Sequence, residues 1–116
     1  MVTVLIVDDH PSFRTSARRV LEDAGYQVIG EAHDGQSALA AARVLRPAVI
    51  LLDVQLPDLD GFEVALQLTA SEDAPAVVLT SSREGNEFGG LVAASRARGF
   101  LPKDEVSGPA LAALLR

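Results

Sequence analysis

The sequence predicts an α/β fold in which helices cover both faces of a parallel sheet. Two short, mostly apolar runs, Val2–Val7 and Ala48–Leu52, indicate strands that are buried on both faces, as the strands of a parallel sheet are. Strand and helix patterns then alternate five times along the chain, which is typical of repeated βα units. Of the 116 residues, 48% are hydrophobic and only 22% are charged, which favours a globular domain over a disordered chain.

The first two βα units occupy the N-terminal half of the chain. After the strand at Val2–Val7, apolar residues recur at helical spacing, and Gly25 ends the predicted helix. The second strand, Tyr26–Glu31, is less apolar, and an alanine-rich helix follows it over Gln36–Leu45, ending before Pro47. The apolar positions of the first helix are Phe13, Ala17, Val20, Leu21 and Ala24.

Three more units complete the chain. Gly85, Gly89 and Gly90 weaken the first half of the fourth helix, which the segment 81–97 must hold. Ser107 suits an N-cap and Pro109 a first helical turn, so they predict the start of the last helix. The predicted strands and helices are, in order, Ala48–Leu52, Phe62–Thr69, Ala76–Thr80, a helix within Ser81–Ala97, Gly99–Pro102 and Ala110–Leu115.

Five such units give a doubly wound, flavodoxin-like sandwich, for which we expect the strand order 2-1-3-4-5. Pro102 fits this order, because the last strand would lie at the edge of the sheet, where a missing N–H is tolerated. No repeat, low-complexity tract or linker interrupts residues 1–116, so we expect one domain. The chain stops where the fifth helix is expected to end, which leaves open an output domain beyond it.

Composition excludes several classes of function. The net charge of −6 argues against binding of nucleic acid by this domain alone. No apolar stretch approaches the ~18 residues of a membrane helix, and Met1 leads directly into a strand without a signal peptide. Cysteine is absent, which excludes disulfides and thiolate metal sites. We therefore expect a cytoplasmic protein.

Three carboxylates follow two of the predicted buried strands. Asp8 and Asp9 come after the first strand, and Asp53 comes after the third. Because the carboxyl ends of parallel strands meet at one edge of a sheet, we expect these side chains to converge. Clustered carboxylates repel one another unless a cation joins them, and Mg²⁺ prefers oxygen ligands. The sequence therefore predicts a Mg²⁺ site and favours phosphoryl chemistry.

Two more groups reach the same edge. Thr80 ends the fourth strand, and its hydroxyl could donate to a phosphoryl oxygen on Asp53, since a carboxylate can accept a phosphoryl group. Lys103 follows the fifth strand and brings an ammonium that would balance the acids. Taken singly, each of these side chains is of a kind that is common in turns or on protein surfaces. Their occurrence together, at the ends of four strands, supports a functional site. His10 and His33 lie in predicted loops without metal-ligand spacing, and we interpret both as facing solvent.

These residues stand in motifs that resemble one known family, the receiver domain of two-component response regulators. The motifs are Asp8-Asp9, the segment Leu52–Gly61, Leu79-Thr80-Ser81 and Phe100-Leu101-Pro102-Lys103. The resemblance covers essentially the whole chain, with the motifs in the family's order.

The resemblance implies specific roles. Asp53 would accept a phosphoryl group from a sensor histidine kinase or from acetyl phosphate, and Lys103 would contact that group. Thr80 and Phe100 would be the switch residues that reshape the face formed by the fourth helix, fifth strand and fifth helix. The Mg²⁺ ligands would be Asp8, Asp9, Asp53 and the main-chain carbonyl of Gln55. Such a domain is a signalling switch that assists its own phosphorylation and dephosphorylation, rather than an enzyme. A C-terminal DNA-binding domain and a homodimer formed on phosphorylation are left open.

The chain departs from the family pattern in two places. The interval from Thr80 to Lys103 is one residue longer than expected, near the glycine-rich fourth helix, which affects the predicted signalling face. Asp104 follows Lys103 where many relatives have proline with a cis bond; a non-proline cis bond costs roughly 3 kcal/mol, so we predict a trans bond. Gln55 and Ser82 flank the pocket, where we expect them to tune hydrolysis.

Four other functions share part of this sequence pattern. An adaptor without an attached domain would use the same chemistry, and the length of the native gene product would distinguish it. A flavin-binding domain would need a phosphate-cradling loop after the first strand, where Asp8 and Asp9 would repel phosphate. A phosphatase with an aspartyl-phosphate intermediate commonly has a second acid where Gln55 stands. A degenerate receiver would lack pocket residues that are all present here.

Overall fold

The computed structural model describes residues 1–82 and 88–116, and it contains one sheet of five parallel strands in the order β2-β1-β3-β4-β5. This is the strand order predicted from the sequence. The strands are β1 (Thr3–Val7), β2 (Gln27–Ala32), β3 (Val49–Asp53), β4 (Ala76–Ser81) and β5 (Gly99–Pro102). The helices are α1 (Pro11–Asp23), α2 (Gly35–Leu45), α3 (Gly61–Leu68), α4 (Leu91–Ala94) and α5 (Gly108–Leu115), with a short 3₁₀ helix at Lys103–Glu105.

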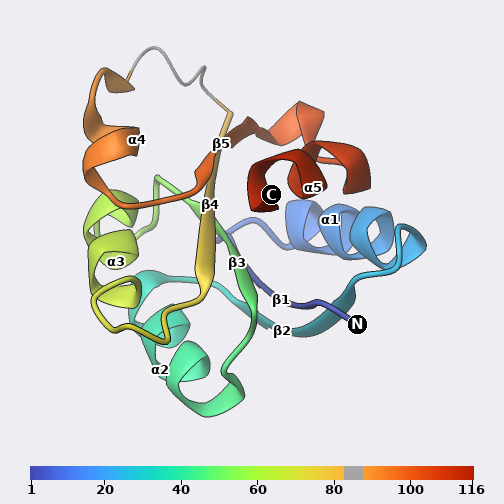
Figure 1. Ribbon diagram of the computed structural model, residues 1–116, viewed down its shortest axis with the longest axis horizontal. Coiled ribbons are helices and arrows are strands. Elements are labelled where there is room, and N and C mark those ends of the chain that lie inside the picture. The colour runs from blue at the N-terminus through green and yellow to red at the C-terminus, as the bar shows by residue number, and fades with distance from the viewer. Residues whose placement is uncertain (83–87) are drawn as a thin grey trace.

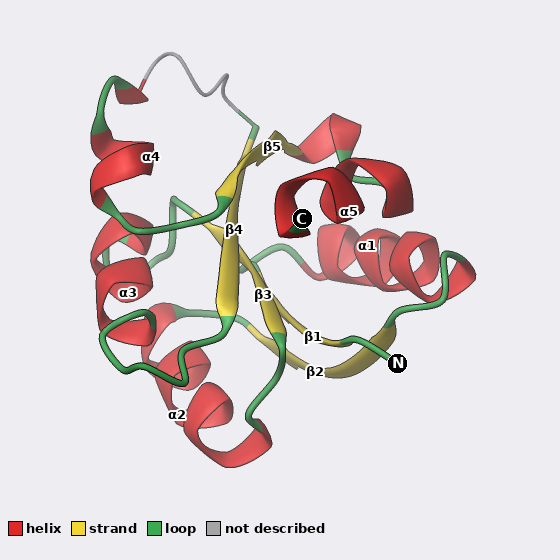
Figure 2. Ribbon diagram, in the orientation of Figure 1, coloured by secondary structure: helices red, strands yellow, loops and turns green. Residues whose placement is uncertain are grey.

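The helices form two layers, one on each face of the sheet. Figure 1 shows α2, α3 and α4 on one side and α1 and α5 on the other, and Figure 2 shows the strands between them. Successive residues of a strand point to opposite faces, so each central strand contributes to both layers. On β3, Ile50 and Leu52 pack in the α2–α3–α4 layer, whereas Val49 and Leu51 pack in the α1–α5 layer. This two-sided burial explains why β1 and β3 are continuous apolar runs.

Side chains at the helix starts set where several helices begin. Asp34 and Ser37 form a capping box at the start of α2, and Ser107 accepts a hydrogen bond from the Ala110 N–H at the start of α5. Asp60 caps α3 by accepting from the Phe62 N–H. Of these caps, the sequence analysis predicted only the one at Ser107.

Most predicted elements are confirmed within two residues. In the segment predicted to hold the fourth helix, the described helix is α4, only four residues long, and Gly89 before it has a positive φ of 56°. Gly85 lies outside the described residues, as does much of the predicted first half of that helix. The Lys103–Asp104 bond is trans, as predicted. Among the described residues, no helix is both long enough and apolar enough to span a membrane.

Candidate functional site

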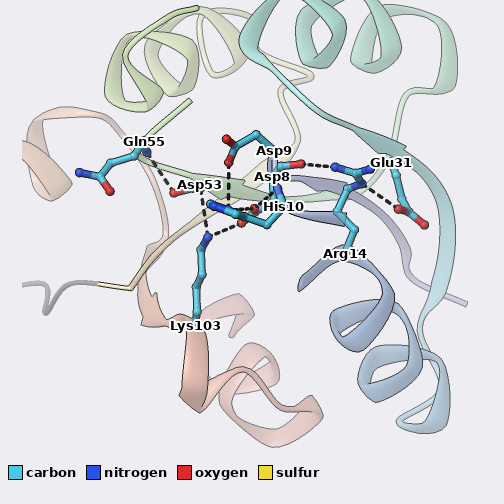
Figure 3. Close-up of polar contacts among 8 residues, drawn as sticks. All are labelled: Asp8, Asp9, His10, Arg14, Glu31, Asp53, Gln55 and Lys103. Carbon is cyan, nitrogen blue, oxygen red and sulfur yellow. Dashed lines mark hydrogen bonds and ion pairs between the residues drawn. The ribbon is translucent and has the colours of Figure 1, made fainter. Parts of the chain in front are cut away.

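The carboxyl ends of the strands bring Asp53 to the centre of the candidate site. Asp53 is the last residue of β3, its register neighbour on β4 is Thr80, and only 2% of its surface is exposed. The Gln55 N–H donates to its Oδ1 at 3.0 Å, and the Lys103 ammonium donates to its Oδ2 at 3.2 Å (Figure 3). Both carboxylate oxygens are therefore held in place by neighbours from different segments of the chain.

Lys103 joins this carboxylate to a second one. Its Nζ lies 2.6 Å from Oδ2 of Asp8, which follows β1 and is fully buried. The lysine side chain is 17% exposed, and its Nζ also lies 5.0 Å from the centre of the Phe13 ring. One ammonium thus bridges two buried carboxylates, at the edge of the sheet where we expected Lys103 to lie.

The shared burial changes the proton affinity of these groups. Burial raises the pKa of the Asp53 carboxyl, and the nearby Asp8 carboxylate raises it further, against the opposing effects of the Gln55 N–H and Lys103. Burial acts to lower the pKa of Lys103, but Asp8 and Asp53 outweigh it and raise that pKa above its usual value. The lysine therefore remains an ammonium at neutral pH, while the burial of Asp53 disfavours the charged form of its carboxyl.

Asp9 and His10 lie at the more exposed side of the same cluster. The His10 Nδ1 is 3.0 Å from a carboxylate oxygen of Asp8 and 3.0 Å from one of Asp9. Its ring is 64% exposed, so the prediction that it faces solvent is correct. Although the sequence shows no metal-ligand spacing at His10, one of its ring nitrogens lies within 4.8 Å of a carboxylate oxygen of each acid in the cluster. The loop turns back on itself after β1, because the His10 N–H donates to Asp8 Oδ1 at 2.8 Å. His33, the other exposed histidine, lies 3.4 Å from a carboxylate oxygen of Asp34.

The Arg14 side chain stabilises the turn that follows β1, and its role was not predicted from the sequence. Its Nη1 donates to the Asp8 carbonyl at 2.6 Å and its Nε to Glu31 on β2 at 3.0 Å. Arg18, one helical turn later, donates to the other Glu31 oxygen at 2.8 Å. Burial opposes ionisation of Glu31, but the hydrogen bonds from both arginines lower its pKa overall. The i, i+4 spacing of the arginines was visible in the sequence; their shared partner was not.

The loop from β3 to α3 is anchored on two sides. Asp58 accepts hydrogen bonds from the Gly35 N–H at 2.7 Å and the Gln36 N–H at 2.9 Å, at the start of α2. These backbone donors lower the pKa of Asp58 against the opposing effect of desolvation. At the other end, Gly61 lies so close to the backbone of Asp53 and Val54 that a Cβ there would overlap it. This close approach requires glycine and keeps the loop beside Asp53.

Thr80 and Phe100 occupy the positions predicted for a switch. Thr80 is fully buried, and its Oγ1 has no hydrogen-bond partner among the described residues. Phe100 is partly buried in the α2–α3–α4 layer, where its ring centre lies 5.7 Å from that of Phe88, which in turn lies 5.4 Å from Phe62. An unpaired buried hydroxyl is costly, so Thr80 is suited to a ligand oxygen that arrives beside Asp53.

The residues present fit a divalent cation. Among the described residues, Asp8, Asp9, His10 and Asp53 each offer a ligand atom, and these atoms all lie within 4.8 Å of one another. Three carboxylates and the single Lys103 ammonium leave two negative charges, which a divalent cation would balance. The Gln55 side chain is exposed and points away from the cluster in Figure 3, so this residue can contribute only through its backbone.

Comparison with known proteins relates the whole chain to one family. The family model described as "Response regulator receiver domain" matches residues 4–115. The response regulator GacA of Pseudomonas protegens is 38% identical over 104 residues, which cover 89% of this chain and 49% of the relative. The transcriptional regulatory protein PdtaR of Mycobacterium tuberculosis is 37% identical over 78 residues, covering 67% of this chain and 38% of the relative. The chain thus spans half the length, or less, of these curated relatives.

Solved structures agree over nearly the full chain. The signal receiver domain of NarL from Mycobacterium tuberculosis has a TM-score of 0.83 at 34% identity, covering 98% of this chain and 96% of that one. The chemotaxis response regulator CheY4 of Vibrio cholerae has a TM-score of 0.83 at 32% identity, covering 99% and 96%. The similarity therefore includes every strand end that contributes to the site.

Proposed function

Because the chain belongs to the family of response regulator receiver domains, we propose that it is a phosphoacceptor switch that receives a phosphoryl group on Asp53. The observation that carries this proposal is the convergence on Asp53 of a buried acid, a buried unpaired hydroxyl and an ammonium. These belong to Asp8, Thr80 and Lys103, and each comes from a different strand end. Residues 1–116 would form a single receiver domain.

The proposed reaction is transfer of a phosphoryl group between two nucleophiles. A carboxylate oxygen of Asp53 forms the new P–O bond, while the P–N bond of a phosphohistidine, or the P–O bond of acetyl phosphate, breaks. The electron pair leaves with the imidazole or the acetate. Lys103 lies 3.2 Å from Asp53 and would stabilise charge on the transferring group, and the Thr80 hydroxyl would donate to one of its oxygens.

Asp8, Asp9, Asp53 and the Gln55 carbonyl would hold Mg²⁺. When bound, this cation offsets the repulsion between the acids and an incoming phosphoryl group. Asp8 is held for this role on both sides, because Lys103 contacts its carboxylate and Arg14 donates to its carbonyl. An oxygen-rich shell of this kind is the one that Mg²⁺ prefers.

Phosphorylation would change the packing of Phe100 and thereby the surface of the domain. A phosphoryl oxygen beside Asp53 gives the Thr80 hydroxyl the partner that it lacks among the described residues, which favours movement of Thr80. Phe100 neighbours β4 in the register and packs in the apolar layer, so such a movement would change its environment. The face formed by α4, β5 and α5 would be the output surface, on which Leu91 is half exposed.

Partners follow from the family and from the length of the relatives. We expect a sensor histidine kinase as the phosphoryl donor and a cytoplasmic location. GacA is about twice as long as this chain, which supports a C-terminal DNA-binding output domain in the full protein. The net charge of −6 favours nucleic-acid contact by that domain and not by this one. A homodimer formed on phosphorylation belongs to the same proposal.

Intact-mass spectrometry tests the assignment directly. Incubation with acetyl phosphate should add one phosphoryl group to the wild type when Mg²⁺ is present and none when it is removed by a chelator. Asp53→Asn should abolish the gain, and the matched control Asp73→Asn, an exposed surface acid, should keep it. A gain retained in Asp53→Asn would contradict the choice of acceptor. Absence of both phosphorylation and beryllofluoride binding in the wild type would contradict the proposed function.

A further inference from the structure

We infer that the His10 imidazole is an additional ligand of the cation site, one that extends its preference from Mg²⁺ toward transition-metal ions. This inference rests on the proposed cation site at Asp8, Asp9 and Asp53, and it adds a nitrogen donor to a set that is otherwise made of oxygens. Three observations support the inference: the His10 ring lies between two carboxylates, the ring is exposed, and a backbone hydrogen bond fixes the residue there.

The spacing of the donor atoms matches an octahedral ion. His10 Nδ1 lies 3.0 Å from a carboxylate oxygen of Asp8 and 3.0 Å from one of Asp9. With metal–ligand bonds of about 2.1 Å, adjacent ligand atoms of an octahedral ion are about 3.0 Å apart. The nitrogen therefore already stands at the separation from each carboxylate oxygen that adjacent ligands require. Figure 3 shows the His10 ring between these two acids.

The local backbone keeps the ring in this position. The His10 N–H donates to Asp8 Oδ1 at 2.8 Å, which folds the residue back over the carboxylate. Pro11 follows at the first position of α1, where its restricted φ favours the helix start. The ring itself is 64% exposed, so it can rotate onto an entering ion without breaking core packing.

His33 provides a matched comparison within the same chain. It is 69% exposed and also lies next to an aspartate, but its nearest carboxylate oxygen is 3.4 Å away. It is not one of the residues grouped as metal ligands among the described parts of the chain. An exposed histidine beside one acid is thus an ordinary surface contact here, and the two-acid geometry is what distinguishes His10.

A nitrogen donor changes which ions bind best. Carboxylate and carbonyl oxygens suit Mg²⁺ and Mn²⁺, whereas imidazole suits Ni²⁺, Zn²⁺ and Cu²⁺. Loss of a group that merely supports a metal ligand commonly weakens binding by ~10-fold or more, and loss of a direct ligand should have at least that effect. Removal of His10 should therefore weaken Ni²⁺ binding much more than Mg²⁺ binding.

Isothermal titration calorimetry of the untagged chain with Ni²⁺ and with Mg²⁺ tests this difference. We expect His10→Ala to raise the Kd for Ni²⁺ by ~10-fold or more and to change the Kd for Mg²⁺ by less than ~3-fold. His33→Ala should leave both unchanged, and Asp9→Asn should weaken both. Imidazole ¹⁵N NMR with Zn²⁺ gives a second readout, in which the His10 Nδ1 resonance should shift on binding and the His33 ring should not.

The outcomes separate the inference from its premise. If the wild type binds both ions and His10→Ala binds Ni²⁺ as tightly as the wild type, His10 is not a ligand, although the cation site stands. If neither ion binds the wild type, the cation site of the proposed function is wrong, and the inference fails with it. A selective loss of Ni²⁺ affinity together with the His10 Nδ1 shift would establish the nitrogen ligand.

Discussion

Replacing Asp53 with asparagine should stabilise the cation-free fold while abolishing phosphorylation. Asp53 is almost fully buried, it shares the Lys103 ammonium with Asp8, and the Asp9 carboxylate lies nearby. The substitution removes one negative charge, keeps the shape of the side chain and retains an oxygen that can accept the Gln55 N–H. The raised pKa of the Asp53 carboxyl also predicts stabilisation by this substitution, because the folded state disfavours the charged form of the carboxyl.

The size of the effect can be worked from the distances. At an effective dielectric constant of ~20, the Lys103 and Asp53 charges 3.2 Å apart attract by about 5 kcal/mol. Two carboxylates separated by at most 4.8 Å repel by at least ~3.5 kcal/mol on the same basis. Asp53 has two such neighbours, Asp8 and Asp9, so its net interaction is unfavourable by about 2 kcal/mol. Removal of this repulsion should raise the free energy of unfolding by about that amount.

Urea denaturation followed by far-ultraviolet circular dichroism measures this free energy, since the chain has no tryptophan to report by fluorescence. The measurement is made at neutral pH and low salt with excess chelator. In a thermal melt, a gain of ~2 kcal/mol in the free energy of unfolding corresponds to a Tm increase of ~8 °C for a domain of this size. Added Mg²⁺ should stabilise the wild type through binding and narrow the difference.

The control is Asp73→Asn, which makes the same change of charge on the exposed surface and should change stability by less than ~0.5 kcal/mol. The reasoning is refuted if Asp53→Asn is no more stable than this control, or less stable than the wild type, in the absence of divalent cation. Either result would mean that the Lys103 pairing outweighs the repulsion among the acids.

Three further changes test other parts of the site. Thr80→Val should stabilise the unphosphorylated protein by ~1 kcal/mol in urea denaturation, because it removes a buried hydroxyl without a partner among the described residues. The same variant should still be phosphorylated but should show smaller NMR shifts at Phe100; full shifts would remove Thr80 from the switch. Arg14→Ala should weaken Mg²⁺ binding by ~10-fold in calorimetry, because Asp8 loses the donor to its carbonyl; unchanged affinity would refute this positioning role. Glu31→Gln should cost well under ~1 kcal/mol at pH 7, because this ion pair is partly exposed. The pKa of Glu31 in the folded state lies below its usual value, so its stabilisation is present above the pKa of the unfolded chain and should vanish as the pH falls through the folded value; a loss that persists under acid would contradict it.

The predictable part of this protein was the part encoded in local patterns. Continuous apolar runs indicated β1 and β3, and their two-sided burial is what the structure shows. Because every parallel strand ends at the same edge, residue order alone placed Asp8, Asp53 and Lys103 together, and the ion pairs at 2.6 and 3.2 Å confirm that placement. The site could thus be located without any knowledge of the turns between the elements.

Two of the contacts that could not be predicted from the sequence join segments that are distant along the chain. Asp58 was not singled out in the sequence, yet it accepts hydrogen bonds from the start of α2, 22 and 23 residues away in sequence. Arg14 was not singled out either, yet it donates hydrogen bonds to both the Asp8 carbonyl and Glu31. Contacts of this kind join segments whose relative position is set by the packing of whole layers, so no local pattern encodes them.

The strand order, the edge that holds the site and the acids that line it could all be predicted from residue order, because burial and chain connectivity act through periodicity that can be read along the chain. The packed fold was needed to show that Asp8 and Asp53 share one ammonium, and that the Thr80 hydroxyl lacks a partner among the described residues. The contacts of Lys103 join side chains at the ends of different strands. Their distances are set only when the layers have packed around the sheet.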